Sequence, residues 1–457
     1  MTTQTKRNST AEWQAQDRQH LHPFTDHAEL GRVGAKVITR AEGTYLYDSD
    51  GNKILDAFAG LWCVNIGYGR KSIAEVAREQ LLELPYYNTF FKTTHPPVAE
   101  LSKLLVEMTP KQFNHVFYGL SGSDANDTIV RMVRTYWNLK KQPKKKTIIS
   151  RWNGYHGSTM VAASLGGMNY MHELADLPLP GHSHIRQPYW YGEGKDMSPE
   201  DFGKAAAKAL EDRILELGAE NVAAFIGEPI QGAGGVIIPP ATYWPEIQKI
   251  CRKYDLLLIA DEVICGFGRT GYMFASEYYN IEADFMTLAK GLTSGYMPLS
   301  AIMVADRVAE VLNSFGDFNH GFTYSGHPVS CAVAIENIRI IREEKLVENV
   351  RDVTGPYLAQ RLAELQDHPL VGEVRSLGLM AAIELVQDKK THKTFEPLGK
   401  TGTICRDHCV KNNLIMRATR DTMLLSPPLT WTRDHVDECI KLFRAALDST
   451  AKDLGVK

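Results

Sequence analysis

The chain has 457 residues, and 51 lysine and arginine residues nearly balance 54 aspartate and glutamate residues, for a formal net charge of −3. This balance gives no support to a nucleic-acid or anionic membrane partner, and we expect neither. Apolar residues make up 44% and charged residues 23%, as in an ordinary soluble globular protein. No apolar run approaches the roughly 20 residues of a membrane span, and residues 1–20 lack the apolar core of a signal peptide. Seven scattered cysteines without a Cys-x-x-Cys pair favour free thiols in a reducing cytoplasm.

Three regions are expected along the chain. Residues 1–71 are predicted to form a polar arm and one segment of a small domain, with a β-hairpin at 45–56 that turns at Asp50-Gly51. From residue 72 to 329, strand and helix patterns alternate, which predicts right-handed βαβ units and an α/β domain with a mostly parallel sheet. Residues 330–457 change to amphipathic helices and shorter strands, which predicts a smaller C-terminal domain.

The strands predicted in the large domain cover residues 116–118, 147–149, 222–226, 256–263 and 284–291. A helix follows the first of them, because apolar residues recur three and four apart from Ala125 to Trp137. In open α/β sheets, ligands bind outside the carboxyl ends of the parallel strands. The segments that follow these strands are therefore the candidate functional segments.

Ser121-Gly122-Ser123 stands between the first strand and its helix. The serines can cap the helix, and Gly122 lets the backbone approach a ligand closely. A helix N-terminus with free N–H groups and hydroxyls suits an anion such as a phosphate. A plain N-cap without a ligand explains the same pattern.

Two further loops follow strands at this end of the sheet. Residues 151–158 contain Tyr155, which could stack on a flat ring, and His156, for which a hydrogen-bonded structural role is the simpler expectation. Residues 225–235 contain Glu228 and several glycines. A third loop, residues 321–328, contains three hydroxyl side chains, including Thr323, and a turn between domains is its simplest interpretation.

Asp261 and Lys290 end two neighbouring buried strands. An aspartate at a strand end usually caps a helix or forms an ion pair, and most lysines are solvated. The neighbours of Lys290 in the sequence are apolar or small, namely Leu288, Ala289 and Gly291, so we expect little water around its amine. Burial lowers the pKa of a lysine. A reactive amine and an adjacent carboxylate together suit imine chemistry on a carbonyl cofactor with a basic ring nitrogen, and pyridoxal phosphate is the candidate.

We expect no metal site. Cys405 and Cys409 lie one helical turn apart near His408, but a buried thiol pair in a helix is far more common than a metal site of this kind.

Taken together, the motifs resemble those of the class III, fold-type I, pyridoxal-phosphate-dependent aminotransferases along nearly the whole chain. The resemblance is closest to the ω-amine:pyruvate transaminases, including bacterial enzymes that act on putrescine and related diamines. It implies a mostly parallel seven-stranded sheet in a large domain, and a smaller α+β domain built from both chain ends. The matching motifs are residues 121–123, 153–157, 228–232, 261–263 with 268–271, 289–291 and 323–326.

The resemblance assigns roles by position. Lys290 would bind the cofactor covalently and then shuttle the proton between the substrate carbon and the cofactor carbon. Asp261 would pair with the ring nitrogen, Tyr155 and Val263 would enclose the ring, and Glu228 would support the hydrogen bonds beside it. The phosphate would be held by Gly122, Ser123 and, from a second subunit of a homodimer, Thr323.

Departures from the wider class narrow the substrate. Relatives acting on ornithine or 4-aminobutyrate have a glutamate at the position of Ala233, a glutamine at that of Ile264, and an arginine before the Pro-Pro-Leu segment, where this chain has Leu424. Arg417 instead matches the mobile arginine of the ω-amine group, which would bind the carboxylate of pyruvate and swing away for an amine without a carboxylate. A surface salt bridge is the alternative for Arg417.

Trp62, Phe90 from the second subunit, Tyr155 and Ala233 would line an apolar substrate pocket, although core or interface packing also explains such aromatics. Asp124, where the family usually has glutamate, and Ser300, where glycine or alanine is common, have no assigned role.

The activity implied is transfer of an amino group from a primary amine, a diamine such as putrescine or an ω-amino acid, to pyruvate. The products would be an aldehyde or ketone and L-alanine, formed by a ping-pong reaction. The alternatives are a β-alanine:pyruvate transaminase, or an aminomutase, racemase or decarboxylase with the same lysine. A nucleotide-binding module is a more distant alternative, since it leaves Lys290 and Asp261 without a purpose.

Overall fold

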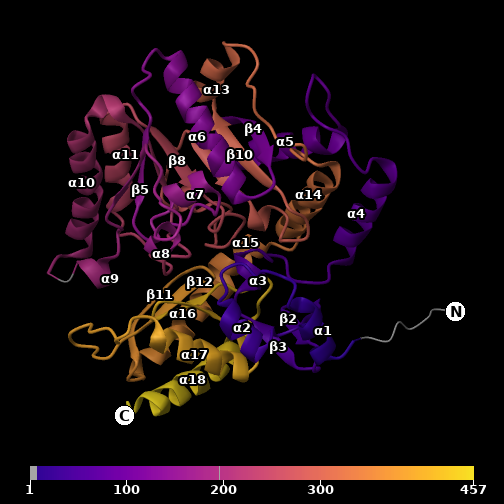
Figure 1. Ribbon diagram of the computed structural model, residues 1–457, viewed down its shortest axis with the longest axis vertical. Coiled ribbons are helices and arrows are strands. Elements are labelled where there is room, and N and C mark those ends of the chain that lie inside the picture. Colours follow the sequence, from indigo (N-terminus) through magenta and orange to yellow (C-terminus); the bar gives the residue numbers. More distant parts are fainter. Residues whose placement is uncertain (1–7, 195, 457) are drawn as a thin grey trace.

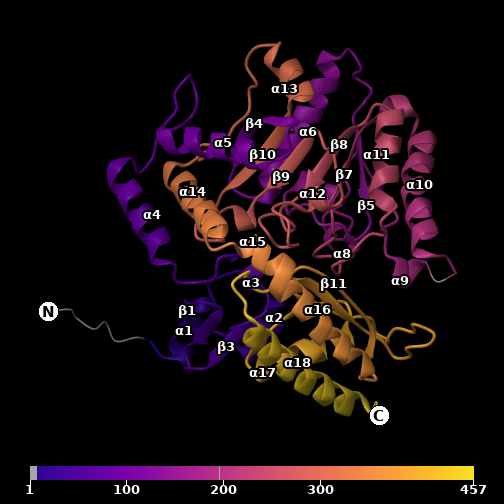
Figure 2. The same ribbon diagram turned by 180° about the vertical axis from the view of Figure 1, so that it is seen from behind.

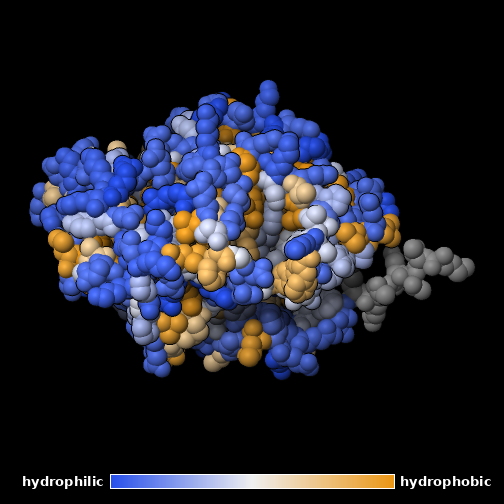
Figure 3. All heavy atoms as spheres, turned by 90° about the horizontal axis from the view of Figure 1, so that it is seen from above, coloured by the Kyte–Doolittle hydropathy of each residue, from blue (hydrophilic) through white to orange (hydrophobic). Residues whose placement is uncertain are grey.

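The computed structural model describes residues 8–194 and 196–456; residues 1–7 of the predicted arm lie outside this range. A large domain surrounds a seven-stranded sheet, and a smaller domain with two four-stranded sheets lies against one end of it (Figures 1 and 2). Seen from above the large domain, the surface is mostly hydrophilic, with separate apolar patches (Figure 3). Among the described residues, no helix is long and apolar enough to cross a membrane.

The large sheet has the order β4-β10-β9-β8-β7-β5-β6. Only β10 runs antiparallel to its neighbours, so the prediction of a mostly parallel seven-stranded sheet is confirmed. The strands are β4 (Phe113–Gly119), β5 (Thr147–Arg151), β6 (His182–Ile185), β7 (Val222–Gly227), β8 (Leu257–Asp261), β9 (Phe285–Leu288) and β10 (Ser300–Ala305).

Alternate residues of these strands enter different apolar cores. Leu257 and Ile259 pack in the core under α6 and α13, whereas Leu258 and Ala260 pack in the core on the opposite face. This alternation follows from the two-residue period of a strand, and it buries both faces of the sheet. The large-domain helices are α4 (Lys71–Glu83), α5 (Pro96–Met108), α6 (Gly122–Leu139), α7 (Met160–Leu165), α8 (Asn169–His172), α9 (Trp190–Glu193), α10 (Pro199–Leu217), α11 (Tyr243–Lys253), α12 (Ala275–Tyr278), α13 (Asp306–Asn313) and α14 (Pro328–Glu343).

The smaller domain is built from the N-terminal and C-terminal regions of the chain. Its first sheet has the order β1-β2-β3-β13, in which β13 (Leu414–Ile415) pairs parallel to β3 (Lys53–Asp56). The predicted hairpin at residues 45–56 is confirmed as β2 and β3. The remaining strands are β1 (Ile38–Glu42), β2 (Tyr45–Asp48), β11 (Val371–Leu377), β12 (Met380–Leu385), β14 (Arg417–Thr419) and β15 (Thr422–Leu425).

The helices around these sheets are α1 (Thr10–Asp17), α2 (His27–Val33), α3 (Ala59–Trp62), α15 (Leu346–Asn349), α16 (Gly355–Ala363), α17 (Lys400–Lys411) and α18 (Arg433–Leu454). The domain boundaries at residues 71/72 and 329/330 remain predictions. Helix α14, which begins at the second boundary, packs against α4 and α5 beside the large sheet.

Candidate active site

A cavity of about 410 Å³ lies at the carboxyl ends of β8 and β9, beside the N-terminus of α6. Seven of the residues predicted to bind a cofactor line this one cavity, although they come from five separate segments of the chain. They are Gly122, Ser123, Tyr155, Glu228, Asp261, Val263 and Lys290. The doubly wound topology brings these segments together, because every parallel strand delivers its following loop to the same edge.

Asp261 is the last residue of β8 and is 2% exposed. Its Oδ2 accepts hydrogen bonds from Nδ1 of His156 over 2.7 Å and from the side-chain amide of Asn126 over 2.9 Å. Within the described part of the chain, its Oδ1 accepts only the Val263 N–H, over 3.1 Å. A carboxylate oxygen has two lone pairs, so Oδ1 can accept one further donor from the cavity.

Lys290 follows β9 and begins a short 3₁₀ turn that ends at Leu292. Its φ of +44° is in the left-handed region, where a non-glycine residue is strained and usually has a specific role. Burial lowers the pKa of Lys290, and the negative charge of Asp261 opposes this effect. The lysine therefore offers a neutral, nucleophilic amine at a lower pH than a solvated lysine does.

The N-terminus of α6 is arranged to bind an anion. Ser121 caps the helix, and its Oγ accepts the Asp124 N–H over 3.3 Å. The backbone N–H groups of Gly122 and Ser123, which line the cavity, donate to no other described residue. The positive end of the helix dipole and two unpaired N–H groups therefore face the cavity together.

Glu228 and Tyr155 form the wall beside this helix. Oε1 of Glu228 accepts the Tyr155 N–H over 3.1 Å, and Oε2 accepts the Gly232 N–H over 2.8 Å. Burial raises the pKa of Glu228. The carboxyl group thus ties the loop after β5 to the loop after β7 and fixes the position of Tyr155.

The other predicted residues do not line this cavity. Trp62, 2% exposed, packs with Phe58 and Ile264 in an apolar cluster, and Ala233 is buried, its carbonyl accepting from the Thr419 hydroxyl over 3.2 Å. Phe90 lies against Gly321 in the loop that contains Thr323.

Arg417 begins β14, directly opposite Leu424 in β15. Residues opposite each other in an antiparallel pair share a face of the sheet, and Leu424 packs in the cluster of Trp62 and Ile264. The guanidinium has no hydrogen bond or ion pair with any residue that the structure describes, so the salt-bridge alternative has no support. Its positive charge helps to lower the pKa of Lys290, which places it near the cavity.

Tyr170 was missed by sequence reasoning. Desolvation raises its pKa, and the charge of Arg417 acts in the opposite direction. Its hydroxyl donates to the sulfur of Met168 over 2.9 Å. It lies in α8, a helix of four residues, and no motif marks it, because so short a helix shows no apolar period.

Asn126 was missed as well, although its position carries a signal. It is fully buried on α6, where the apolar period predicts an apolar residue, and its side chain donates to Asp261 and to the His156 carbonyl oxygen. Its own oxygen accepts from the Thr287 hydroxyl over 2.8 Å. A buried amide inside an apolar helix face indicates such a network.

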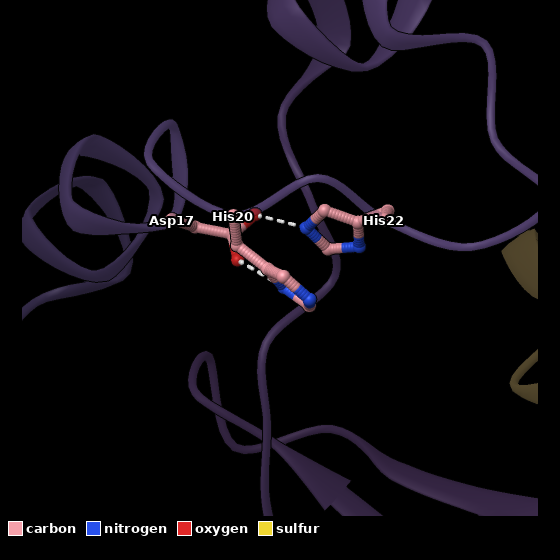
Figure 4. A group of neighbouring side chains, drawn as sticks. All are labelled: Asp17, His20 and His22. Carbon is pink, nitrogen blue, oxygen red and sulfur yellow. Dashed lines mark hydrogen bonds and ion pairs between the residues drawn. The ribbon is translucent and has the colours of Figure 1, made fainter.

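Among the residues that the structure describes, one group of side chains could hold a metal ion, and it lies outside this cavity. Asp17, His20 and His22 place their ligand atoms within 4.8 Å of one another in the N-terminal arm (Figure 4). Nε2 of His22 already lies 2.8 Å from Asp17, and the His20 side chain is 62% exposed. Cys405 and Cys409 are buried free thiols, as predicted.

Comparison with known proteins identifies the family. A model described as Aminotransferase class-III matches residues 30–447. The chain belongs to the class III aminotransferases.

Two relatives and one solved structure show the range of this family. The chain is 60% identical to a putrescine–pyruvate aminotransferase of Pseudomonas aeruginosa, over 99% of both chains. It is 44% identical to a diaminobutyrate–2-oxoglutarate transaminase of Halomonas elongata, over 95% of this chain and 94% of the relative. A Pseudomonas jessenii ω-transaminase in complex with PMP superimposes with a TM-score of 0.94 at 44% identity, covering 97% of this chain and 99% of that chain.

Class III aminotransferases use pyridoxal phosphate, and this enzyme is a pyridoxal-phosphate-dependent aminotransferase. The cavity fits the cofactor at both of its charged ends: unpaired N–H groups at Gly122 and Ser123 suit the phosphate, and the buried carboxylate of Asp261 suits a protonated ring nitrogen. A Cβ atom at Gly122 would lie 3.0 Å from a methyl group of Val263, so glycine keeps this part of the cavity open.

Proposed function

We propose that the enzyme is an ω-transaminase that moves an amino group from a primary amine to pyruvate. The observation that carries this proposal is Arg417, a partly buried guanidinium near Lys290 without a described partner. A free arginine of this kind suits the small carboxylate of a keto acid, which it can bind with two parallel hydrogen bonds. The name of the Pseudomonas aeruginosa relative supports the same reaction.

The proposed cofactor site uses each end of the cavity for one part of the molecule. Gly122 and Ser123, with Thr323 from a second subunit, hold the phosphate; Asp261 pairs with the ring nitrogen, and Glu228 supports the wall beside the ring. Tyr155 and Val263 face the ring on its two sides. Bound pyridoxal phosphate supplies a positively charged ring that withdraws electrons from the reacting substrate carbon.

Lys290 is the proposed catalytic residue. Its neutral amine binds the cofactor covalently and, once released, takes a proton from the substrate carbon and returns one during the reaction. The amine donor would give up its amino group and take the oxygen of a water molecule, so it would depart as an aldehyde or ketone. Pyruvate would then receive the amino group, release its keto oxygen as water and depart as L-alanine, which completes a ping-pong cycle.

The donor is proposed to be a diamine such as putrescine, or an ω-amino acid. Trp62, Ala233 and Tyr155, with Phe90 from the second subunit, form an apolar pocket for its carbon chain. Arg417 swings away for a donor without a carboxylate and binds one that has a carboxylate, so β-alanine is a second candidate donor.

We also propose a cytoplasmic homodimer. Phe90 and Thr323 lie in neighbouring segments outside the chain's own cavity, with the Tyr86 hydroxyl donating to the Thr323 carbonyl oxygen over 2.7 Å. Phe91 beside them is 91% exposed, so this surface presents an aromatic side chain that a second subunit would cover. The seven cysteines are all free thiols, which suits a reducing compartment.

A panel of amines tests the function. The purified enzyme is incubated with pyridoxal phosphate, pyruvate and putrescine, cadaverine, β-alanine or 1-phenylethylamine, and alanine is quantified by chromatography. We expect alanine from the diamines, and none when pyruvate is omitted. An amine that is isomerised or racemised without any keto acid would instead indicate an aminomutase or racemase.

A further inference from the structure

Asp124, on the first turn of α6, connects three parts of the cavity wall. Its carboxylate accepts the Leu120 N–H over 2.9 Å and the Ser121 N–H over 3.0 Å. It also accepts the hydroxyl of Ser300 over 3.2 Å. The first two bonds fold the segment of residues 119–123 back onto the helix.

Ser300 reaches this carboxylate from a distant part of the sequence. It is the first residue of β10 and lies opposite Gly119, the last residue of β4. A Cβ atom at Gly119 would lie 2.6 Å from Oδ1 of Asp124 and 2.7 Å from Oγ of Ser300. The absence of a side chain at Gly119 therefore makes the room in which the carboxylate and the hydroxyl meet.

The hydrogen bonds of Asp124 and Ser121 determine which backbone N–H groups at the start of α6 stay free. Because Asp124 binds those of Leu120 and Ser121, and Ser121 caps that of Asp124, the groups of Gly122 and Ser123 remain for the cavity. Ser300 is fully buried, so its hydroxyl needs an acceptor and holds Oδ1 in place.

We propose that Ser300 is a positioning residue for the phosphate end of the cofactor. Its hydroxyl orients the Asp124 carboxylate, and the carboxylate holds the segment of residues 119–123 so that the Gly122 and Ser123 N–H groups face the cavity. The inference rests on the proposed phosphate role of these two residues. Ser300 and Asp124, two residues that depart from the usual family pattern, thus form one functional pair.

The test compares ligands with and without a phosphate. The apoenzyme, prepared by removing the cofactor, is titrated with pyridoxal phosphate, with pyridoxal, and with inorganic phosphate as a competitor of pyridoxal phosphate. For Ser300→Ala we expect dissociation constants about tenfold higher for pyridoxal phosphate and for phosphate, since a hydrogen bond to a charged group is lost. The dissociation constant for pyridoxal is expected to be unchanged, because pyridoxal does not use this part of the cavity.

Two further variants separate positioning from general damage. Ser102→Ala is a matched control. Ser102, on α5, forms a hydrogen bond with the hydroxyl of Tyr118 in β4, but none with the segment of residues 119–123. Asp124→Asn keeps the shape and removes the charge, and we expect the same loss for phosphate-containing ligands. In Ser300→Ala/Asp124→Asn the two losses are expected to be less than additive.

The outcomes distinguish this inference from the proposed function. A wild-type apoenzyme that binds pyridoxal phosphate no more tightly than pyridoxal contradicts the proposed phosphate site itself. A wild type that prefers the phosphate, with Ser300→Ala keeping the full preference, overturns the inference alone. Equal losses for pyridoxal and pyridoxal phosphate in Ser300→Ala also overturn it, since they indicate only a structural role.

Discussion

Asp261 ends β8 and Lys290 follows the adjacent parallel strand β9, and the carboxylate affects the protonation of the amine. Burial removes water from the lysine and lowers its pKa, while the carboxylate raises it again. Hydrogen bonds from His156 and Asn126 hold the Asp261 carboxylate, so it keeps its position when the contents of the cavity change. Single-residue experiments can separate these two effects on the reactive amine.

In the apoenzyme, Lys290 is expected to react with an amine-acylating reagent at a lower pH than exposed lysines do. The neutral amine is the reacting form, and it is present at lower pH because burial favours it. In Asp261→Asn the midpoint is expected to move to still lower pH, because the charge that raises the pKa of Lys290 is gone. Peptide mass spectrometry after brief labelling from pH 6 to 10 measures both midpoints. A midpoint in Asp261→Asn above that of the wild type would contradict this reasoning.

Arg417→Ala is expected to lower kcat/KM for pyruvate by about 10- to 100-fold, the effect of losing a charge-assisted pair of hydrogen bonds. For a carboxylate-free aldehyde such as butanal as acceptor, the change is expected to be less than about twofold. Initial rates with one diamine donor and both acceptors measure the difference. Arg433→Ala, which removes an arginine that packs over Tyr357 in the small domain, is the charge-matched control. Equal losses for both acceptors would rule out carboxylate binding by Arg417.

At the scale of elements, the cavity depends on loops that are tied to one another behind it. The loop after β5 is held by β6: Nε2 of His184 lies 2.8 Å from the Gly166 carbonyl oxygen, and its ring stacks on Trp152 at 4.6 Å. Burial lowers the pKa of His184 to about 4. The anchor is therefore a neutral imidazole, and its protonation would place a charge in a buried site.

Stability is expected to fall as the pH drops from about 6.5 to about 4, because the unfolded state, with a histidine pKa near 6.5, binds the proton more readily than the folded state. The difference in pKa corresponds to about 3 kcal/mol of unfolding free energy for this one group. Denaturant unfolding of the wild type and of His184→Gln at pH 7.5 and 4.5 measures it. The glutamine cannot titrate, so its loss between the two pH values should be smaller. An identical loss in both proteins would exclude His184 as the acid-sensitive group.

The main elements of the fold and the two reactive charges could be predicted from the sequence, because they follow local rules. The buried strand that ends at Asp261 and the buried strand that precedes Lys290 appear in the sequence as short apolar runs, with a charged residue at or just beyond the end. The contacts among these elements could not be predicted in the same way. Asp124 and Ser300 are 176 positions apart, and neither has a pattern that points to the other.

At the scale of the whole molecule, the proposed site is shared between two subunits. Lys290 lies inside the chain's own cavity, whereas Thr323 lies outside it, in a loop bonded to Tyr86. A site divided in this way makes activity a property of the dimer.

Mixing two inactive variants tests the division. Lys290→Ala lacks the reactive amine, and Thr323→Glu repels the phosphate. When the two are unfolded together and refolded, about half of the dimers are hybrids, each with one intact site, so about a quarter of the wild-type activity is expected. Each variant refolded alone is the control. Residual activity no greater than the sum of these controls would show that both residues serve the same subunit.

The pairing of β13 with β3 has a consequence for the order in which the chain acquires its structure. Leu55 of β3 is buried, but its parallel partner Leu414 is near the other end of the chain. At roughly 5–20 residues per second, a ribosome needs about 20–70 s to make the intervening segment. During that time the N-terminal hairpin has no partner for its outer edge, while the large sheet between them can already close. The edge of β3 therefore stays unpaired on the nascent chain until β13 has been made. The domain that carries Arg417 is the last to form.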